Sequence, residues 1–224
     1  MNTTHIHIAS VRALENPAVF NNLFNTVSAL RQKKIQQLRF DSDKRLSLGV
    51  AVLLRQLLRE ENFSPDEMQF SPDSHGKPQC LSHPEIHVSL SHSGEYAMAA
   101  LSCRAVGCDV EQLRDAAPLD VARRFFSEKE YNFLISLPIE KQTDAFFRLW
   151  SLKESFTKAV GTGITVPLNN IVPDLNTTPA SFSGCENASI AVCEPDFSSK
   201  YACACCVIHP PMDHHFVWSM QDFN

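Results

Sequence analysis

Residues 150–161, Trp-Ser-Leu-Lys-Glu-Ser-Phe-Thr-Lys-Ala-Val-Gly, are the most informative stretch of this sequence. The apolar pattern predicts a long amphipathic helix over Thr143–Val160, and Gly161 suits its C-terminal cap. Glu154 and Lys158 are one helical turn apart, so they share one surface of this helix. An exposed ion pair explains that spacing as well as a metal- and phosphate-binding surface does, and the stretch alone leaves both interpretations open.

A second acidic motif, Asp109-Val110-Glu111, lies upstream on a strand predicted over Ala105–Gln112. Side chains two residues apart on a strand point to the same face, so the two carboxylates lie side by side, and Val110 faces the core. Adjacent carboxylates repel each other unless a cation or a proton lies between them. Mg²⁺ prefers such oxygen ligands, although a solvated face of an edge strand is the simpler interpretation of this motif alone.

Three further motifs can be explained by local structure when each is taken alone. Ser127 and Glu130 have the spacing of a capping box at a helix N-terminus. Ser91-His92 follows an apolar strand, where a hairpin turn or a phosphate-binding role is possible. Neighbouring residues on one turn rarely have the geometry of a nucleophile and its base, so we do not expect Ser91 to be a nucleophile. Lys77, between Gly and Pro, suits an ordinary exposed turn.

The remaining pattern contains helices and a small group of strands in each half of the chain, without βαβ alternation. This order favours an α+β fold with antiparallel sheets. Helices are expected over Phe24–Arg39, from about Asp41 to Glu60, over Pro118–Phe126 and from Ser127 onward. Strands are expected over Ile6–Ala9, 86–91, Tyr96–Cys103, Ala105–Gln112, Ala188–Glu194, Lys200–Ile208 and His214–Met220.

The composition limits the classes of function. The chain has 224 residues, of which 44% are hydrophobic, so it can form a proper core. Its formal net charge of −5 argues against a general nucleic-acid-binding protein. The N-terminus lacks the features of a signal peptide, and no apolar run reaches the length of a membrane span. We therefore expect a cytoplasmic protein that binds no membrane.

The eight cysteines indicate neither a disulfide framework nor a zinc site, since they include no C-x-x-C pair. Cys203, Cys205 and Cys206 fall in the apolar run Tyr201–Ile208, which is typical of a buried strand with thiols as small core residues. A metal- or redox-binding protein built on these cysteines is the alternative interpretation.

Taken in order, the motifs resemble those of the 4′-phosphopantetheinyl transferases, in particular the type that activates surfactin synthetase. The resemblance covers roughly residues 30 to 168, and the last two motifs after the Asp-x-Glu are highly specific as a set. The matching pieces are Gly76-Lys77-Pro78, Ser91-His92-Ser93-Gly94, Gly107-Cys108-Asp109-Val110-Glu111, Arg124-Phe125-Phe126-Ser127-x-x-Glu130 and Trp150-Ser151-x-Lys153-Glu154-Ser155-x-x-Lys158-x-x-Gly161.

The resemblance implies two similar α+β halves related by a pseudo-twofold axis, with coenzyme A in the cleft between them. We expect the N-terminal half at residues 1–104 and the half that carries the acids at residues 105–224. The length suits the monomeric members of the family. The implied reaction transfers the 4′-phosphopantetheine arm of coenzyme A to a serine of an apo carrier protein and releases adenosine 3′,5′-bisphosphate.

The resemblance also implies a role for each matching residue. Asp109, Glu111 and Glu154 would hold Mg²⁺ on the pyrophosphate of coenzyme A, and Lys158 would neutralise developing charge. Glu154 is the expected acceptor of the serine proton, with Glu130 in support. Contacts to the coenzyme are implied for Arg31, Lys34, Lys77, Ser91, His92, Lys153 and Lys158.

Some positions depart from the family pattern, and one alternative function remains. Val110 stands between the two acids, where some relatives have an acidic residue, so water would complete the coordination of the metal. Arg31 stands where lysine is common, and Leu46 stands where a small polar residue is frequent. The alternative function is a scaffold that binds coenzyme A or a carrier protein without turnover. Carriers of peptide-synthetase, polyketide, polyunsaturated-fatty-acid and fatty-acid type all fit the sequence.

Overall fold

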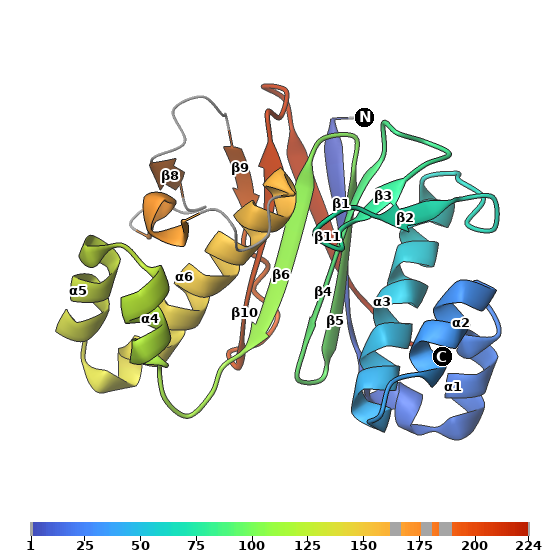
Figure 1. The fold of residues 1–224 in the computed structure, drawn as a ribbon, viewed down its shortest axis with the longest axis horizontal. Helices are drawn as coiled ribbons and strands as arrows, with labels where there is room; N and C mark the ends of the chain where they lie inside the picture. The colour runs from blue at the N-terminus through green and yellow to red at the C-terminus, as the bar shows by residue number, and fades with distance from the viewer. Residues whose placement is uncertain (1, 162–166, 176–180, 184–189, 224) are drawn as a thin grey trace.

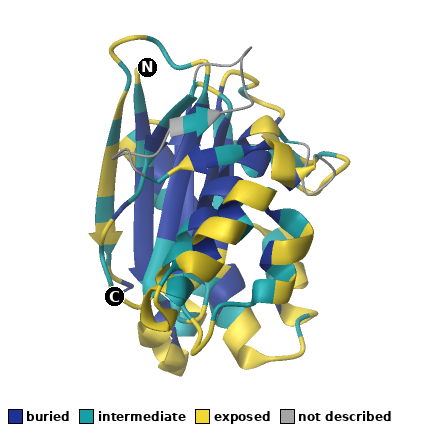
Figure 2. Cartoon of the chain, turned by 90° about the vertical axis from the view of Figure 1, so that its left-hand side faces the viewer, coloured by how far each residue is buried: buried dark blue, intermediate teal, exposed yellow. Residues whose placement is uncertain are grey.

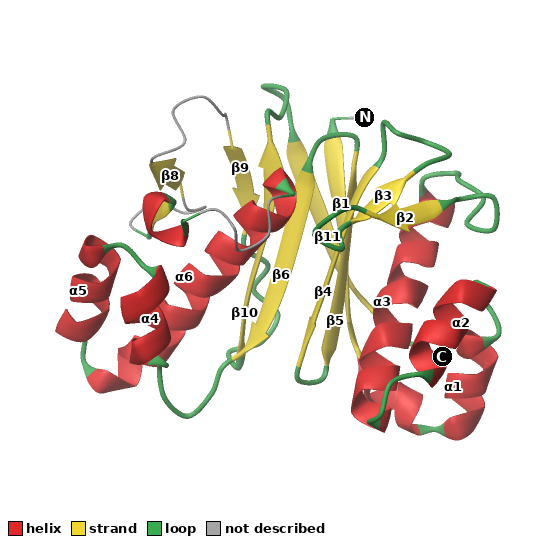
Figure 3. Cartoon of the chain, in the orientation of Figure 1, coloured by secondary structure: helices red, strands yellow, loops and turns green. Residues whose placement is uncertain are grey.

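The computed structural model describes residues 2–161, 167–175, 181–183 and 190–223. Its strands lie in the centre of the molecule, and two groups of helices cover the outer sides (Figures 1 and 3). The inner strands Tyr96–Ser102 and Val106–Gln112 are mostly buried, whereas exposed residues gather on the outer faces of the helices and on the strand His215–Gln221 (Figure 2). The arrangement confirms the expected α+β class.

The larger sheet has six strands in the order β11-β1-β5-β4-β3-β2. The strand β1, next to the edge strand β11, pairs antiparallel with β5 and parallel with β11. The expectation of wholly antiparallel sheets is therefore wrong at this one pair. The strands are β1 (Thr3–Ser10), β2 (Phe70–Pro72), β3 (Pro78–Cys80), β4 (His87–Ser93), β5 (Tyr96–Ser102) and β11 (His215–Gln221).

The smaller sheet has three antiparallel strands in the order β6-β10-β9, and β7 and β8 form a separate pair. The strand β9 is shorter than the predicted segment, of which residues 188 and 189 lie outside the described part of the chain. These strands are β6 (Val106–Gln112), β7 (Val172–Asp174), β8 (Ser181–Ser183), β9 (Ile190–Cys193) and β10 (Tyr201–Ile208).

One long helix packs on each sheet: α3 on the larger sheet and α6 on the smaller sheet. The α-helices are α1 (Pro17–Phe24), α2 (Ala29–Gln36), α3 (Asp41–Glu60), α4 (Leu119–Phe125), α5 (Glu128–Ser136) and α6 (Ile139–Val160). Two short 3₁₀ helices are η1 (Val11–Glu15) and η3 (Leu168–Asn170). The described residues contain no helix that is both long and apolar enough to span a membrane.

The predicted helix Phe24–Arg39 is shorter in the structure, where α2 covers Ala29–Gln36 and Phe24 is the last residue of α1, a helix that was not predicted. The chain leaves the first helix after Phe24, and Ser28 caps the second by accepting a hydrogen bond from the backbone N–H of Arg31. A serine in this position satisfies a backbone donor that has no partner inside the helix. The apolar spacing of the segment did not reveal this break.

The described residues form four apolar clusters, three of which hold the layers together. One lies between α3 and the larger sheet, one between the two sheets, and one between α6 and β10. Val106, Cys108 and Val110 of β6 belong to the cluster between the sheets, which confirms that Val110 faces the core. The residues between them therefore face α6, and this alternation places the acids of β6 in front of that helix.

The C-terminal strand crosses into the first half of the molecule. His215–Gln221 pairs with β1, and Phe223 is buried in the cluster under α3. The segment 105–224 therefore does not form one closed half, since its last strand completes the sheet of the other. The pairing of β11 with β1 thus joins the two halves through the C-terminal segment.

Candidate active site

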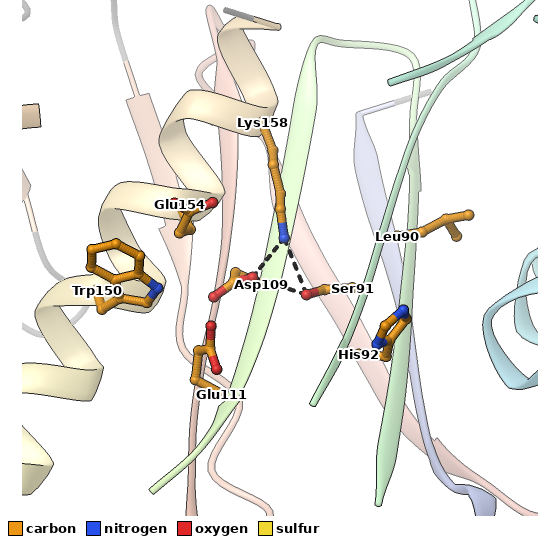
Figure 4. A pocket seen from close by; sticks show the side chains of 8 residues that line it. All are labelled: Leu90, Ser91, His92, Asp109, Glu111, Trp150, Glu154 and Lys158. Carbon is orange, nitrogen blue, oxygen red and sulfur yellow. Dashed lines mark hydrogen bonds and ion pairs between the residues drawn. The ribbon is translucent and has the colours of Figure 1, made fainter. Parts of the chain in front are cut away.

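A pocket lies where β4, β6 and α6 meet, at the junction of the two halves (Figure 4). Each of the three elements contributes side chains that point toward a common space. The lining residues are Leu90, Ser91 and His92 from β4, Asp109 and Glu111 from β6, and Trp150, Glu154 and Lys158 from α6. The two acidic motifs and the helix of residues 150–161 are thus brought together by the fold.

Gly107 allows α6 to approach β6 closely enough to form this pocket. A Cβ atom at this position would overlap the backbone carbonyl of Ser155 and the amide nitrogen of Ala159. Only glycine leaves room for the backbone of a helix at such short range. The close approach sets Glu154 and Lys158 directly over the acids of β6.

Lys158 joins the three elements of the pocket. Its Nζ lies 2.6 Å from Asp109 Oδ1, and it also donates to the Ser91 hydroxyl at 3.1 Å and to the Cys108 carbonyl at 3.2 Å. Burial lowers the pKa of Lys158, but the charge and hydrogen bond of Asp109, together with the charges of Cys108 and Glu154, outweigh burial and hold the pKa above its ordinary value. Lys158 is therefore a fixed positive charge inside the pocket.

Two buried carboxylate oxygens in the pocket have no hydrogen-bond partner. They are Oδ2 of Asp109 and Oε1 of Glu154. Buried polar atoms without a partner are rare because each costs the free energy of its lost hydration. One ammonium group faces three carboxylates here, so the site has an excess of negative charge.

Burial also raises the pKa of Glu154 and of Glu111. At Glu154, Lys158 opposes this effect and Asp109 adds to it. At Glu111, the charge of Asp109 raises the pKa further, against Ser93, Lys158 and Trp150. The positive charge and the hydrogen-bond donors around both carboxyl groups are thus insufficient to offset the cost of burying their ionised forms.

These observations fit a hard divalent cation with oxygen ligands. Asp109, Glu111 and Glu154 are the three acids of the pocket, and the unpartnered oxygens belong to two of them. Among the described residues no three His, Cys, Asp or Glu side chains already form a preset metal cluster. Lys158 instead partners Asp109, which shows that this carboxylate attracts positive charge.

The Ser91 hydroxyl is already engaged within the pocket, and its predicted contact with a coenzyme phosphate stays a prediction. Its hydroxyl donates to Asp109 Oδ1 at 2.9 Å and accepts from Lys158 and from the backbone N–H of Val110. A serine hydroxyl has one donor and two acceptor positions, and all three are in use. Ser91 therefore holds the acid and the lysine in place.

The predicted basic residues of the first half lie on α2 or beside the pocket. Arg31 is partly buried, and burial lowers its pKa, whereas Lys34 is exposed on the same helix. His92 lines the pocket, and burial together with the charge of Lys158 lowers its pKa. The charge of Arg31 also contributes to lowering the pKa of His92.

Lys77 connects the first half to the end of α6. Its Nζ donates to the carbonyl of Ala159 at 3.1 Å, and its backbone N–H donates to Asp73 Oδ1 at 2.9 Å. A cation beside the last carbonyls of a helix is favourable because that end of the helix is partially negative. Lys77 thus contacts Ala159, the residue that follows Lys158, and does not lie in an ordinary exposed turn.

Glu130 and Lys153 form a buried ion pair outside the pocket lining, with Nζ and Oε1 2.8 Å apart. Glu130 also completes the predicted capping box with Ser127, and Lys153 donates to the carbonyls of Leu168 and Ile171. Lys153 is 0% exposed and Glu130 4%. Both side chains thus form a buried structural pair, and the predicted coenzyme contact of Lys153 and the catalytic role of Glu130 stay predictions.

Lys153→Met is expected to destabilise the protein strongly, since it leaves the buried carboxylate of Glu130 without a counter-charge. Breaking a buried pair on one side typically costs about 3–5 kcal/mol. Urea unfolding measures this loss, and the double variant with Glu130→Gln should recover part of it. A single variant as stable as the wild type would contradict the structural role of the pair.

Ser93 contributes to the site, although the sequence motifs predicted no separate role for it. Its hydroxyl donates to Glu111 Oε2 at 3.1 Å and accepts from the backbone N–H of Gln112 at 3.1 Å. The available signal was the alternation of Ser89, Ser91 and Ser93, which places three hydroxyls on one face of a strand.

The cysteine-based alternative finds no support in the described thiols. Cys108 and Cys205 are fully buried in the apolar cluster between the sheets, and Cys203 lies in the same cluster. Burial raises the pKa of Cys108 to about 11 and that of the other two well above the ordinary value. Such thiols are poor ligands and poor nucleophiles. Cys185 lies outside the described residues.

Comparisons with known proteins point to one family. The model of the 4′-phosphopantetheinyl transferase superfamily matches residues 105–206, and that of the N-terminal part of these transferases matches residues 16–104. The 4′-phosphopantetheinyl transferase gsp of Aneurinibacillus migulanus is 29% identical over 91% of this chain and 85% of its own length. The 4′-phosphopantetheinyl transferase Sfp of Bacillus subtilis (strain 168) is 31% identical over 82% of this chain and 83% of its own length.

Solved structures are similar to part of the chain. One of them is a holo-(acyl-carrier-protein) synthase from Bacillus anthracis str. Ames in complex with CoA (3′,5′-ADP). It shares 23% sequence identity with this chain and covers 46% of it and 94% of that protein, with a TM-score of 0.41.

Proposed function

Because this chain belongs to the 4′-phosphopantetheinyl transferase superfamily, we propose that the pocket between β4, β6 and α6 is its active site. The protein transfers the 4′-phosphopantetheine arm of coenzyme A to a serine of an apo carrier protein and releases adenosine 3′,5′-bisphosphate. The observation that carries the assignment is the set of three acids around one lysine, with two buried carboxylate oxygens lacking a partner.

Asp109, Glu111 and Glu154 would hold Mg²⁺ in this site. When bound, the ion supplies positive charge to the pyrophosphate of coenzyme A and so stabilises the leaving group. Each of the three carboxylates comes from an element whose position is fixed by packing, with Asp109 and Glu111 on β6 and Glu154 on α6. The cation would also relieve the unfavourable burial of these acids.

The transfer itself needs positioning and charge neutralisation rather than a protein nucleophile. The serine oxygen of the carrier forms a bond to the phosphorus next to the pantetheine arm. The bond from that phosphorus to the bridging oxygen breaks, and its electrons leave with adenosine 3′,5′-bisphosphate. Lys158, held at the junction of the three elements, stabilises the negative charge on the phosphates.

Glu154 is the proposed acceptor of the serine proton. Its carboxyl group lines the pocket, one oxygen has no partner, and burial raises its pKa above that of an ordinary glutamate. A carboxylate with a raised pKa accepts a proton more readily at neutral pH. Glu130 contributes indirectly, because its ion pair with Lys153 holds the middle of α6 in place.

Arg31 and Lys34 of α2 are proposed to bind the 3′-phosphate of coenzyme A. Replacing both with Ala should weaken binding of coenzyme A roughly 10- to 100-fold, since hydrogen bonds to charged groups contribute about 1.5–3 kcal/mol. Binding of dephospho-coenzyme A should hardly change, and calorimetry can compare the two ligands. Lys33→Ala with Arg39→Ala removes the same charge from neighbouring exposed positions and serves as the control. Equal losses for both ligands would reject this role.

The activity separates the transferase from a scaffold that only binds coenzyme A or a carrier. With coenzyme A, Mg²⁺ and an apo carrier, a transferase releases adenosine 3′,5′-bisphosphate in a single turnover, which chromatography detects. A scaffold would bind the coenzyme and release none. Absence of the released nucleotide with carriers of every type named above would overturn the proposed function.

A further inference from the structure

Three serines of β4 join the two halves of the protein through their side chains. The strands β4 and β6 belong to different sheets, and Ser89, Ser91 and Ser93 bridge them. Each hydroxyl accepts a hydrogen bond from a backbone N–H of β6, at the positions Cys108 (2.9 Å), Val110 (3.3 Å) and Gln112 (3.1 Å). The serines of β4 and the donor residues of β6 are each two positions apart, so the three hydrogen bonds repeat with the same period along both strands.

Two of these contacts also involve a carboxylate. Ser91 donates to Asp109 Oδ1 at 2.9 Å, and Ser93 donates to Glu111 Oε2 at 3.1 Å. In each case the serine accepts from the residue that follows the acid, so one hydroxyl is fixed by the backbone and directed at the carboxylate. At Ser89 the corresponding residue is Gly107, which has no side chain.

We propose that Ser93 and Ser91 are positioning residues that hold Glu111 and Asp109 in the orientation needed to bind Mg²⁺. This inference rests on the proposed function of the pocket. The neighbouring carboxylates repel each other, and Glu111 is a flexible side chain, so a fixed donor limits the directions it can take. Hydrogen bonds from outside the set of metal ligands orient those ligands in the same way in other metal sites.

Ser93 and Ser89 give a matched pair of variants. Ser93→Ala and Ser89→Ala each remove one hydroxyl that accepts from a backbone N–H of β6, and only the first removes a donor to an acid. Both should therefore lower the melting temperature. Ser93 is only partly buried, so its variant should still fold. Ser93→Thr keeps the hydroxyl and should behave like the wild type.

The test measures Mg²⁺ affinity by calorimetry in the presence of coenzyme A without any carrier, together with kcat/KM for transfer. Ser93→Ala should reduce both by roughly 10- to 100-fold, the usual effect of losing a residue that orients a metal ligand. Ser89→Ala should change both less than about twofold, because its hydroxyl contacts no acid and so lacks the orienting effect on a metal ligand. The KM for the carrier should be the same in all variants.

Equal Mg²⁺ affinities of Ser93→Ala and Ser89→Ala would overturn the positioning role, as would a Ser93→Thr variant no better than Ser93→Ala. A wild type that binds no Mg²⁺ would overturn it too. Failure of the proposed function gives a different result. In that case the wild type transfers nothing to any carrier, while the calorimetric difference between the two alanine variants still supports the positioning role.

Discussion

Asp109→Asn is expected to reduce kcat/KM for phosphopantetheine transfer by roughly a thousandfold, the scale seen when a group that stabilises transition-state charge is lost. The variant removes the most buried of the three acids, with 3% of its surface exposed. It also removes the negative charge that holds Lys158 at 2.6 Å. The amide is nearly the same size, so the pocket keeps its shape while it loses charge.

Asp109→Asn should also be less stable than the wild type, because Lys158 loses its counter-charge. Because the folded pKa of Lys158 is raised, its ammonium stabilises the fold at pH values below the ordinary lysine pKa of 10.5. This contribution is lost as the pH rises through the folded pKa. Asp109→Asn removes the strongest of the charges that raise this pKa, so the melting temperature at neutral pH should fall.

Asp66→Asn is the control for Asp109→Asn. Asp66 pairs with Arg55 at 2.8 Å, but its side chain is 77% exposed, and such surface pairs contribute about 0–1 kcal/mol. The control should retain full transfer activity and nearly full stability. Near-normal turnover of Asp109→Asn in the same assay would refute the role of this acid in the site.

Glu154→Gln is expected to abolish transfer as severely as Asp109→Asn and yet to raise the melting temperature in metal-free buffer at neutral pH. Glu154 has one buried oxygen without a partner, and burial raises its pKa. The ionised carboxylate is thus unfavourable in the folded protein until a cation reaches it. A neutral amide of the same size removes this penalty together with the function.

The stability gained by Glu154→Gln depends on pH, because the gain comes from removing a titratable carboxyl group. The folded protein binds a proton to Glu154 more tightly than the unfolded chain does, so stability falls as the pH rises from the unfolded pKa of 4.5 through the folded pKa. Above the folded pKa the full cost of burying the ionised Glu154 carboxylate applies, and below the unfolded pKa this cost disappears. The stability gained by Glu154→Gln should therefore be largest at neutral pH and should vanish near pH 4.

Thermal unfolding at several pH values measures this effect, with the exposed Glu67→Gln as the control. The control should show no such gain and should retain transfer. A lower melting temperature for Glu154→Gln at neutral pH would show that Glu154 is already well partnered. Persistent transfer would show that Glu154 is not essential for the reaction.

The parts of the site that the sequence predicted depend on local spacing. Asp109 and Glu111 share a face because strand side chains alternate, and Ser127 and Glu130 form their capping box within one helical turn. Gly161 ends α6 in the left-handed conformation, with a φ of 80°. Each of these features is decided by residues a few positions apart, so periodicity was sufficient to find it.

The parts that the sequence did not predict depend on contacts between distant residues. Lys153 and Lys158 lie on the same helix, and only packing decides that the first is buried with Glu130 while the second faces the pocket. Lys77 meets the carbonyl of Ala159, which is 82 positions away in the chain. The parallel pairing of β11 with β1 joins the two ends of the chain, which no local pattern can indicate.

Mass spectrometry of a carrier protein tests the central claim most directly. An apo carrier incubated with this protein, coenzyme A and Mg²⁺ should gain the mass of one phosphopantetheine on its acceptor serine. A carrier with that serine replaced by Ala should gain none, nor should the natural carrier incubated with Asp109→Asn. An unchanged mass for carriers of peptide-synthetase, polyketide and fatty-acid type alike would contradict the account.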